Sequence, residues 1–198
     1  MTGKKKKMKK AVFLDRDGTM NADINGYISK PQDFELFPFT VQAVSILNEM
    51  GYLVFVVTNQ SGIARGFYTF DDLEKVHEKM RFQLSEQGAR VDGVFSSPYH
   101  EKGKIDPFNI EHEDRKPGLG MFKKALQEFS FSIKDSYMIG DKYSDIVFGR
   151  KAGLTTILVR TGEGNNEFLQ KRHKWEQKPH YIVNDLMSAV KLIEKLRN

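Results

Sequence analysis

Residues Ala11–Thr19 read AVFLDRDGT, a short apolar run that leads directly into two aspartates and a glycine. An apolar run of this length, bounded by charge, is typical of a buried strand. Side chains alternate along a strand, so Asp15 and Asp17 are expected on the same side of its end. Gly18 then lets the backbone turn sharply. The stretch therefore predicts a strand that delivers two carboxylates to one place.

Two carboxylates at the end of a buried strand repel each other. They stay ionised only beside a cation, or one of them moves toward its protonated form. Either state suits catalysis, because one group can attack or bind a metal while the other carries a proton. The alternative is an ordinary strand end with solvated charges, and the pair alone does not decide between the two.

The composition sets the outer limits. The chain has 198 residues, of which 39% are hydrophobic and 29% charged, and it has no cysteine. One domain with its own core is expected, and disulfides and thiolate metal sites are excluded. No apolar run approaches the length of a membrane span, and no apolar segment follows the basic N-terminus, so no membrane association and a cytoplasmic location are expected.

The basic charge is concentrated at the N-terminus. Residues 1–10 contain six lysines and no acid, so 31 − 6 = 25 basic residues face 26 acidic ones in the remainder. This pattern predicts a disordered basic tail over residues 1–10 and a single folded domain over 11–198. A lysine run can also bind nucleic acid or anionic lipid. Because the rest of the chain is near neutral, nucleic acid is not expected as a partner.

Apolar runs and amphipathic segments alternate along the whole chain. Strands are expected at 11–14, 52–57, 91–96, 136–139, 155–159 and 181–183, and helices at 41–50, about 69–87, 118–129, about 144–152 and 185–196. The alternation predicts an α/β fold, a doubly wound, mostly parallel, Rossmann-like sheet with helices on both faces. No insertion is long enough for a large cap domain. Ligands of such folds bind beyond the carboxyl ends of the strands.

Three of the expected strands end in polar residues: Asp15 and Asp17 follow the first, Thr58 and Asn59 end the second, and Gly140-Asp141-Lys142 end the fourth. These groups are expected to converge, because the ends of parallel strands share one edge of the sheet. The three aspartates offer only hard oxygen ligands, which favours Mg²⁺ over zinc. Thr58 and Asn59 offer donors that suit phosphate oxygens.

Arg115-Lys116 adds positive charge just before a proline. Carboxylates, a magnesium ion, hydrogen-bond donors and a lysine together describe a phosphoryl-transfer site. A carboxylate can also accept the phosphoryl group covalently.

At this point the chain resembles the haloacid dehalogenase superfamily of phosphatases. The motif order DxDGT, Thr-Asn, Lys and GDxxxD occurs here as Asp15–Thr19, Thr58–Asn59, Lys116 and Gly140–Asp145. The stretches TNQSGIARG (Thr58–Gly66), DRKPGLGM (Asp114–Met121) and GDKYSD resemble the branch that contains D-glycero-D-manno-heptose bisphosphate phosphatases and histidinol-phosphatases. The first of these stretches favours the heptose side.

The resemblance implies roles for individual residues. Asp15 would be the nucleophile that forms an aspartyl-phosphate, and Asp17 would protonate the leaving oxygen and then activate water. Magnesium would be held by Asp15, by the backbone carbonyl of Asp17 and by Asp141, while Asp145 would orient Lys142 or the metal shell. Thr58 and Lys116 would stabilise the transferring phosphoryl group. The substrate site would include Asp23, Gly26, Asn59, Gln60, Ser61, Arg115 and Lys142.

One departure from the family concerns zinc. Many members of this branch hold a structural zinc ion with three cysteines and a histidine in the loop before Arg-Lys. The corresponding positions here are Ser97, Tyr99, His112 and Asp114. Without a thiolate no zinc is expected, and the loop's polar residues, with His100, are expected to be solvated rather than to form a weaker metal site.

These observations predict a magnesium-dependent phosphoric monoester hydrolase that acts on a small phosphorylated sugar as a monomer. The resemblance implies removal of the 7-phosphate of D-glycero-D-manno-heptose 1,7-bisphosphate, in heptose synthesis for lipopolysaccharide or another surface glycan. The alternatives are a histidinol-phosphate phosphatase, a polynucleotide 3′-phosphatase, or a phosphosugar-binding protein without catalysis.

Overall fold

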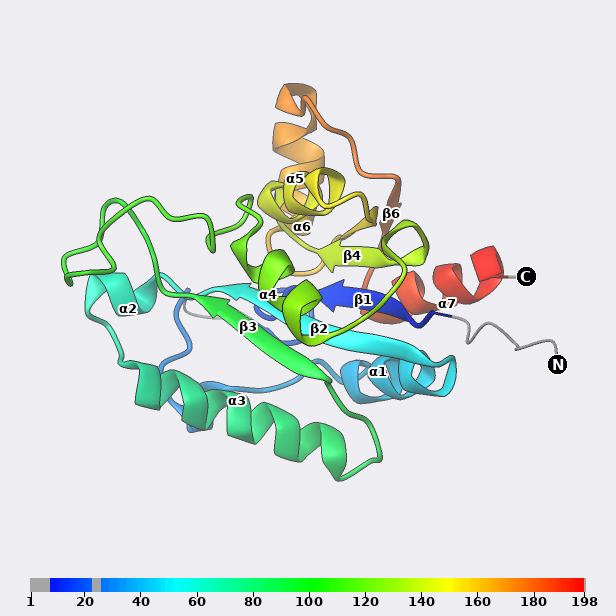
Figure 1. The fold of residues 1–198 in the computed structure, drawn as a ribbon, viewed down its shortest axis with the longest axis horizontal. Coiled ribbons are helices and arrows are strands. Elements are labelled where there is room, and N and C mark those ends of the chain that lie inside the picture. Colours follow the sequence, from blue (N-terminus) through cyan, green and yellow to red (C-terminus); the bar gives the residue numbers. More distant parts are fainter. Residues whose placement is uncertain (1–7, 23–25, 198) are drawn as a thin grey trace, which may run out of the picture.

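The centre of the molecule is a six-stranded sheet. The structure, a computed structural model, describes residues 8–22 and 26–197. The strands are β1 (Lys10–Leu14), β2 (Tyr52–Asn59), β3 (Gly93–Ser97), β4 (Tyr137–Gly140), β5 (Thr155–Val159) and β6 (Tyr181–Val183). They pair in parallel in the order β3-β2-β1-β4-β5-β6, and the arrows of β1 to β4 point the same way in Figure 1. The predicted doubly wound α/β fold is confirmed.

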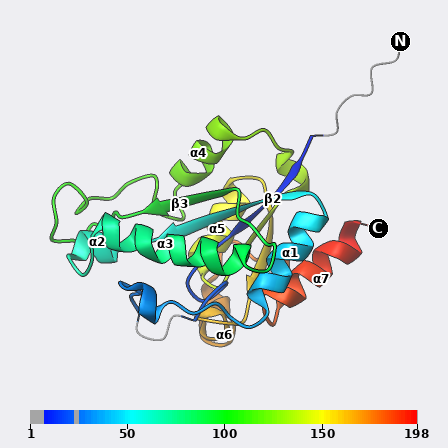
Figure 2. The same cartoon turned by 90° about the horizontal axis from the view of Figure 1, so that it is seen from below.

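Helices cover both faces of the sheet. The helices α1 (Thr40–Glu49), α3 (Phe70–Ser85) and α7 (Leu186–Arg197) pack on one face, and α4 (Gly120–Glu128) and α5 (Tyr143–Lys151) pack on the other (Figure 2). Each face of the sheet has its own hydrophobic core. Side chains alternate between the two faces along β1, so Val12 and Leu14 lie in the core under α1, α3 and α7, and Phe13 lies in the core under α4 and α5. No helix in the described part of the chain has the length and apolar character needed to cross a bilayer.

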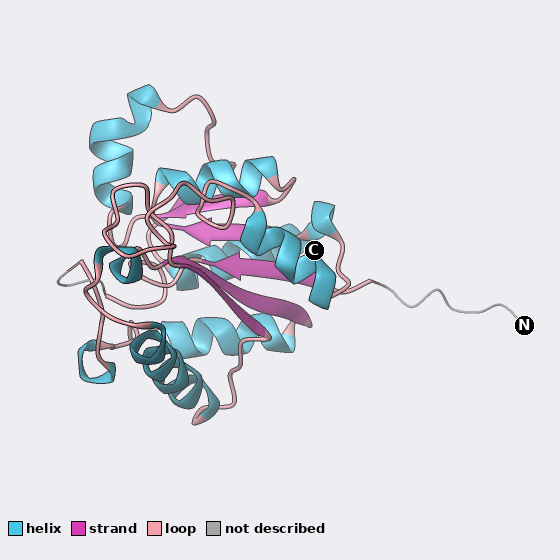
Figure 3. Cartoon of the chain, turned by 60° about the vertical axis from the view of Figure 1, so that its left-hand side comes forward, coloured by secondary structure: helices cyan, strands magenta, loops and turns pink. Residues whose placement is uncertain are grey.

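Short helical turns occupy the connections. These are α2 (Gly62–Arg65), α6 (Gly164–Asn166), a π-helical turn at Glu167–Lys171, and 3₁₀ turns at Pro31–Asp33, Ile133–Asp135 and Arg172–Lys174. Figure 3 shows the long loops gathered at one end of the sheet. The loops after β1 and β3 carry no second sheet within the described residues, in line with the expected absence of a large cap domain.

The start of α3 shows how closely local sequence can determine structure. Thr69 accepts a hydrogen bond from the Asp72 backbone N–H at 3.2 Å, and the Asp72 carboxylate accepts one from the Thr69 N–H at 3.0 Å. This reciprocal capping box satisfies two donors that a helix start leaves without partners. Aspartate here takes the place of the usual glutamate, and the helix begins close to the predicted position.

The tail predicted over residues 1–10 includes two residues that belong to the folded domain. Lys10 belongs to β1 and pairs with Tyr52, and Lys9 forms a bridge with Phe131. Pairing of the backbone with a neighbouring strand outweighs the polar character of these two side chains. Residues 1–7 lie outside the described part of the chain, so disorder there stays a prediction.

A buried histidine on α3 predicts a pH-dependent stability. His77 is 2% exposed, and burial, then repulsion from Arg16 and Arg81, lower its pKa to about 4 although Glu74 attracts the charged form. As the pH falls below 6.5, His77 becomes protonated in the unfolded chain but stays neutral in the folded protein. The unfolded state is therefore favoured, and stability is lost between pH 6.5 and about pH 4. We expect this group to account for a loss of about 2 kcal/mol between pH 6.5 and 5.

Urea unfolding of wild type and His77→Leu at pH 7.5, 6.5 and 5 measures this contribution. Between pH 6.5 and 5, wild type should lose about 2 kcal/mol more unfolding free energy than His77→Leu. His173→Leu, which changes an exposed histidine, should show the same pH dependence as wild type. Parallel curves for wild type and His77→Leu would contradict the assignment.

Candidate active site

The site lies where the central strands β1 and β4 end. The backbone N–H of Asp15 donates to the Ile139 carbonyl at 3.0 Å, so the chain leaves both strands side by side. The β1–β4 junction is also where the strand order reverses, which is the usual ligand position in open α/β sheets. The structure thereby brings Asp15 and Asp141 together at one edge, although the chain between them forms most of the fold.

Three buried carboxylates meet at this edge. Asp15, Asp141 and Asp145 each place an oxygen within 4.8 Å of the others, and theirs is the only group of three potential metal ligands among the described residues. Burial, then repulsion from Asp15, raises the pKa of Asp141 well above its usual range. Burial also raises the pKa of Asp145 to about 6, although Lys116 attracts its charged form. A set of oxygen donors that repel one another fits a hard divalent cation.

Two glycines bring backbone close to the Asp141 carboxylate. A Cβ at Gly18 would lie 2.2 Å from Asp141 Oδ2, and one at Gly162 would lie 2.3 Å from the same atom. Gly18 also has φ +86°, a conformation that side chains rarely adopt. The Glu163 N–H donates to Asp141 Oδ2 at 2.8 Å and holds the carboxylate in place.

Lys116 is the cation of the site. Its Nζ lies 2.8 Å from Asp15 Oδ1 and 2.7 Å from Asp145 Oδ1, and it donates to the Val57 carbonyl at 2.7 Å. Burial by itself would lower the pKa of Lys116, but attraction by Asp145 and Asp15 outweighs burial and raises it. The ammonium group therefore stays charged. Asn59 holds this segment from β2, because its amide exchanges hydrogen bonds with the Lys116 backbone at 2.9 and 3.1 Å.

Asp17 faces the same cavity but has different partners. Arg16, which is fully buried, donates from Nε and Nη2 to the two Asp17 oxygens at 2.9 Å each. Asn21 Nδ2 and Gln60 Nε2 also donate to the carboxylate, at 3.0 and 2.8 Å. Burial alone would raise the pKa of Asp17, but Arg16 and these hydrogen bonds lower it. Asp17 is held as a carboxylate in the absence of substrate.

Two hollows open at the strand ends and share Lys116. The smaller one, about 30 Å³, is lined by Asp15, Asp17, Thr58, Asn59, Lys116, Lys142 and Ser144. The larger one, about 680 Å³, is lined by loop residues before α4 that include His100, His112 and Arg115. The small cavity has the predicted catalytic groups Asp15 and Asp17, and the large one has room for the body of a ligand.

The other residues predicted for the substrate site are distributed unevenly. Arg115 lines the large hollow, where burial and then repulsion from Arg65 lower its pKa, and its Nη1 donates to the Tyr99 carbonyl at 3.2 Å. Ser61 precedes α2 and Gly26 is exposed on the first loop, and neither is among the residues that line these two hollows. Asp23 lies outside the described residues.

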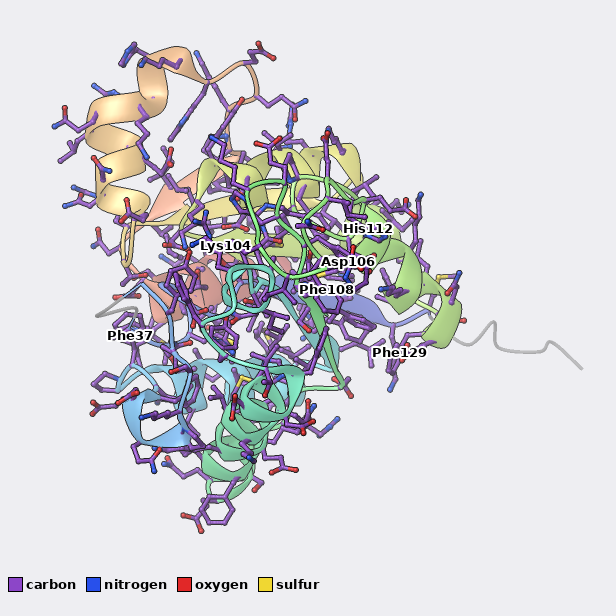
Figure 4. All side chains as sticks on the ribbon, turned by 90° about the vertical axis from the view of Figure 1, so that its left-hand side faces the viewer. Phe37, Lys104, Asp106, Phe108, His112 and Phe129 are labelled. Atoms are coloured by element: carbon purple, nitrogen blue, oxygen red, sulfur yellow. The ribbon has the colours of Figure 1, made fainter. Side chains whose placement is uncertain are left out.

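The loop before Lys116, for which no zinc was expected, is held by side-chain packing. The Tyr99 and His112 rings stack with centroids 3.8 Å apart and planes 16° apart. Asp114 pairs with Lys124 on α4 at 2.6 Å. Figure 4 shows His112 on this loop with Lys104, Asp106 and Phe108, on the face toward the viewer, and Phe129 apart from them at the end of α4. Ring stacking and one ion pair hold this loop.

Sequence reasoning missed three residues around the predicted catalytic groups, Arg16, Asn21 and Tyr68, and one of the two partners of Asp145. Asp145 was expected to orient Lys142, and its Oδ2 does accept from the Lys142 N–H at 3.0 Å, but its other oxygen pairs with Lys116. A carboxylate one helical turn after Asp141 was the available signal. For Arg16, Asn21 and Tyr68, nothing in the local sequence indicates a partner.

Fold and site together define a class of protein. A parallel sheet with a DxD pair after its first strand, and with a buried lysine and further aspartates converging on that pair, is the arrangement of haloacid dehalogenase-type hydrolases. A family model described as HAD-hydrolase-like matches residues 114–189.

Known proteins of similar sequence and structure narrow the class. The chain is 36% identical to D-glycero-beta-D-manno-heptose-1,7-bisphosphate 7-phosphatase of Pasteurella multocida, over 96% of this chain and all of the relative, and 37% identical to the Haemophilus ducreyi protein of the same name, over 92% and 97%. The crystal structure of D,D-heptose 1,7-bisphosphate phosphatase from B. bronchiseptica, complexed with magnesium and phosphate, superposes with a TM-score of 0.81 at 27% identity, covering 94% of this chain and 99% of that one. The chain belongs to the heptose bisphosphate phosphatase family of the haloacid dehalogenase superfamily.

Proposed function

We propose that this protein is a magnesium-dependent phosphatase that removes the 7-phosphate of D-glycero-D-manno-heptose 1,7-bisphosphate. The observation that carries the proposal is the small cavity, in which Asp15, Asp17, Thr58 and Lys116 surround one space at the edge where three buried carboxylates meet. The names of the relatives supply the substrate, and the cavity supplies the chemistry.

Asp15 is the nucleophile in this proposal. One of its carboxylate oxygens bonds to phosphorus while the bond from phosphorus to the sugar oxygen breaks. The leaving oxygen takes a proton from Asp17, which acquires that proton because a bound phosphate dianion raises the pKa of a neighbouring carboxyl group. Asp17 then takes a proton from water, whose oxygen bonds to phosphorus and releases Asp15 and phosphate.

Magnesium fits beside Asp15 and Asp141, with Asp145 close by and the Asp17 carbonyl as a further ligand. When bound, the ion would neutralise charge on the phosphoryl oxygens. Lys116 pairs with Asp15 and holds its carboxylate in place, and Thr58 donates to a phosphoryl oxygen. Asn59 and Lys142 line the small cavity, and Arg115 lines the large one, which shares Lys116 with it and has room for the rest of a bisphosphate.

A panel of phosphate esters tests the substrate. Hydrolysis of heptose 1,7-bisphosphate, histidinol phosphate and 3′-phosphorylated DNA is followed by phosphate release, with Mg²⁺ and with EDTA. We expect the highest kcat/KM for the heptose bisphosphate and loss of activity in EDTA that Mg²⁺ restores. A preference for either other ester would overturn the substrate, and binding without turnover of any ester would favour a non-catalytic protein.

The nucleic-acid alternative has its own control. Because Lys10 is part of β1 and Lys9 pairs with Phe131, the deletion is limited to residues 1–7. The deletion variant is tested for salt-dependent DNA binding and for ester hydrolysis. If it loses DNA binding and keeps hydrolysis, the N-terminal lysines bind DNA nonspecifically and the active site does not bind it.

A further inference from the structure

Gln60 was expected to touch substrate, but its side chain is occupied by the protein. It is 2% exposed, and its Nε2 donates to Asp17 Oδ2 and to Thr58 Oγ1, each at 2.8 Å. Its Oε1 accepts from the Tyr68 hydroxyl at 2.6 Å. Both amide protons and the carbonyl oxygen are therefore in use, and Gln60 is not among the residues that line either hollow.

The two ends of this chain of hydrogen bonds determine which way the amide points. The Asp17 carboxylate only accepts hydrogen bonds, so it requires Nε2 on its side. An amide turned over would place Oε1 against the carboxylate, where two oxygens repel each other. The Tyr68 hydroxyl supplies the donor that Oε1 needs on the other side. Burial raises the pKa of Tyr68, which keeps that hydroxyl protonated.

Tyr68 is itself fixed by packing. Its ring lies over Gly62, where a Cβ would approach Tyr68 Cε1 to 2.1 Å, and it packs in a small apolar cluster with Ile63, Leu73 and Phe108. It directly precedes Thr69, the capping residue of α3. The hydroxyl is thus held by the corner between α2 and α3 rather than by the active site.

We propose that Tyr68 is a positioning residue that orients Asp17 through Gln60. The inference rests on the proposed function of Asp17 as the proton donor to the leaving group. Arg16 and Asn21 would hold the Asp17 carboxylate from its own loop, whereas the hydrogen bond from Gln60 ties it to β2 and α3. Without the hydroxyl, Gln60 Oε1 loses its donor, and the amide is held only through Nε2, so its hydrogen bond to Asp17 is less firmly fixed.

Tyr68→Phe tests the proposal, because it removes one oxygen and keeps the ring. The readout is a comparison of leaving groups: an alkyl phosphate, whose poor leaving group needs a proton, and 4-nitrophenyl phosphate, whose leaving group needs none. We expect kcat for the alkyl ester to fall about 10-fold, kcat for the aryl ester to fall less than 2-fold, and KM to stay within 2-fold for both. Equal losses on the two esters, or no loss on either, would overturn the proposal.

Tyr52→Phe is the matched control. Tyr52 is also buried, at the opposite end of β2, and removing its hydroxyl should leave both rates unchanged. Gln60→Leu should lower the alkyl-ester rate at least as far as Tyr68→Phe, and the double variant should be no slower than Gln60→Leu, because both residues act through one hydrogen-bond chain.

A measurement without turnover separates the two proposals. Hydrogen exchange of the Gln60 side-chain amide, assigned by its loss in Gln60→Leu, should be slow in wild type and Tyr52→Phe and at least 10-fold faster in Tyr68→Phe. Unchanged exchange in Tyr68→Phe would refute the hydrogen-bond chain. If exchange is slow in wild type but no ester is hydrolysed, the proposed function is refuted, whereas the hydrogen bonds from Tyr68 through Gln60 to Asp17 are still supported.

Discussion

Replacing Asp15 with asparagine is expected to abolish hydrolysis, with a loss in kcat of at least roughly 10³-fold. An amide is a poor nucleophile toward phosphorus, and Asp145, the other carboxylate beside Lys116, is not among the residues that line the small cavity. The measurement is steady-state phosphate release with Mg²⁺ present. Denaturing mass spectrometry of the quenched wild-type reaction should also show a phosphoryl adduct that the variant lacks.

Asp135→Asn is the control for this change. Asp135 lies just before β4, at the amino ends of the strands, whereas the site lies at their carboxyl ends. It accepts a hydrogen bond from Ser132 that an asparagine oxygen can also accept. Its kcat should stay within 2-fold of wild type. If Asp15→Asn kept substantial activity under conditions in which Asp135→Asn is normal, Asp15 would not be the nucleophile.

Replacing Lys116 with methionine should reduce both activity and stability. The variant leaves Asp15 and Asp145 buried without their cation, and breaking a buried ion pair from one side costs about 3–5 kcal/mol. We expect the unfolding free energy to fall by about 3 kcal/mol in the absence of Mg²⁺ and kcat to fall by about 10³-fold. Urea unfolding and steady-state kinetics measure the two effects.

Lys124→Met provides the comparison at an exposed site. Lys124 also pairs with an aspartate, Asp114, but its side chain is half exposed, and exposed ion pairs contribute about 0–1 kcal/mol. A similar loss of stability in both lysine variants would show that the burial of Lys116 is not what makes its pairing strong. Adding Mg²⁺ should restore part of the stability of Lys116→Met, because a second cation then faces the same carboxylates, but should not restore kcat.

The sequence was a good guide to the order and position of the catalytic segments. Every strand predicted from an apolar run is present, and β5 and β6 have the predicted limits. The motifs at the strand ends converge because parallel strands place their carboxyl ends on one edge. Convergence of Asp15 with Asp141 therefore follows from the α/β pattern before any side-chain contact is considered.

Prediction was weaker where a side chain's role depends on what packs around it. Gln60 reads from the sequence as a polar residue of the site loop, and a substrate contact is the natural interpretation. In the fold it is buried among Asp17, Thr58 and Tyr68, whose hydrogen bonds use both of its amide protons and its carbonyl oxygen. At the N-terminus the error was of the opposite kind, since Lys10 is polar but extends β1 through its backbone.

Local pattern and composition were sufficient to determine the strand and helix order, the family motifs and the edge of the sheet where the site lies, because these depend on periodicity and on the geometry of parallel strands. Only the tertiary structure decided that Lys116 bridges Asp15 and Asp145, and that Tyr68 reaches Asp17 through Gln60. Those pairings form because burial removes water as a competing partner, and a buried polar group must then bond to whichever group the folded chain places beside it.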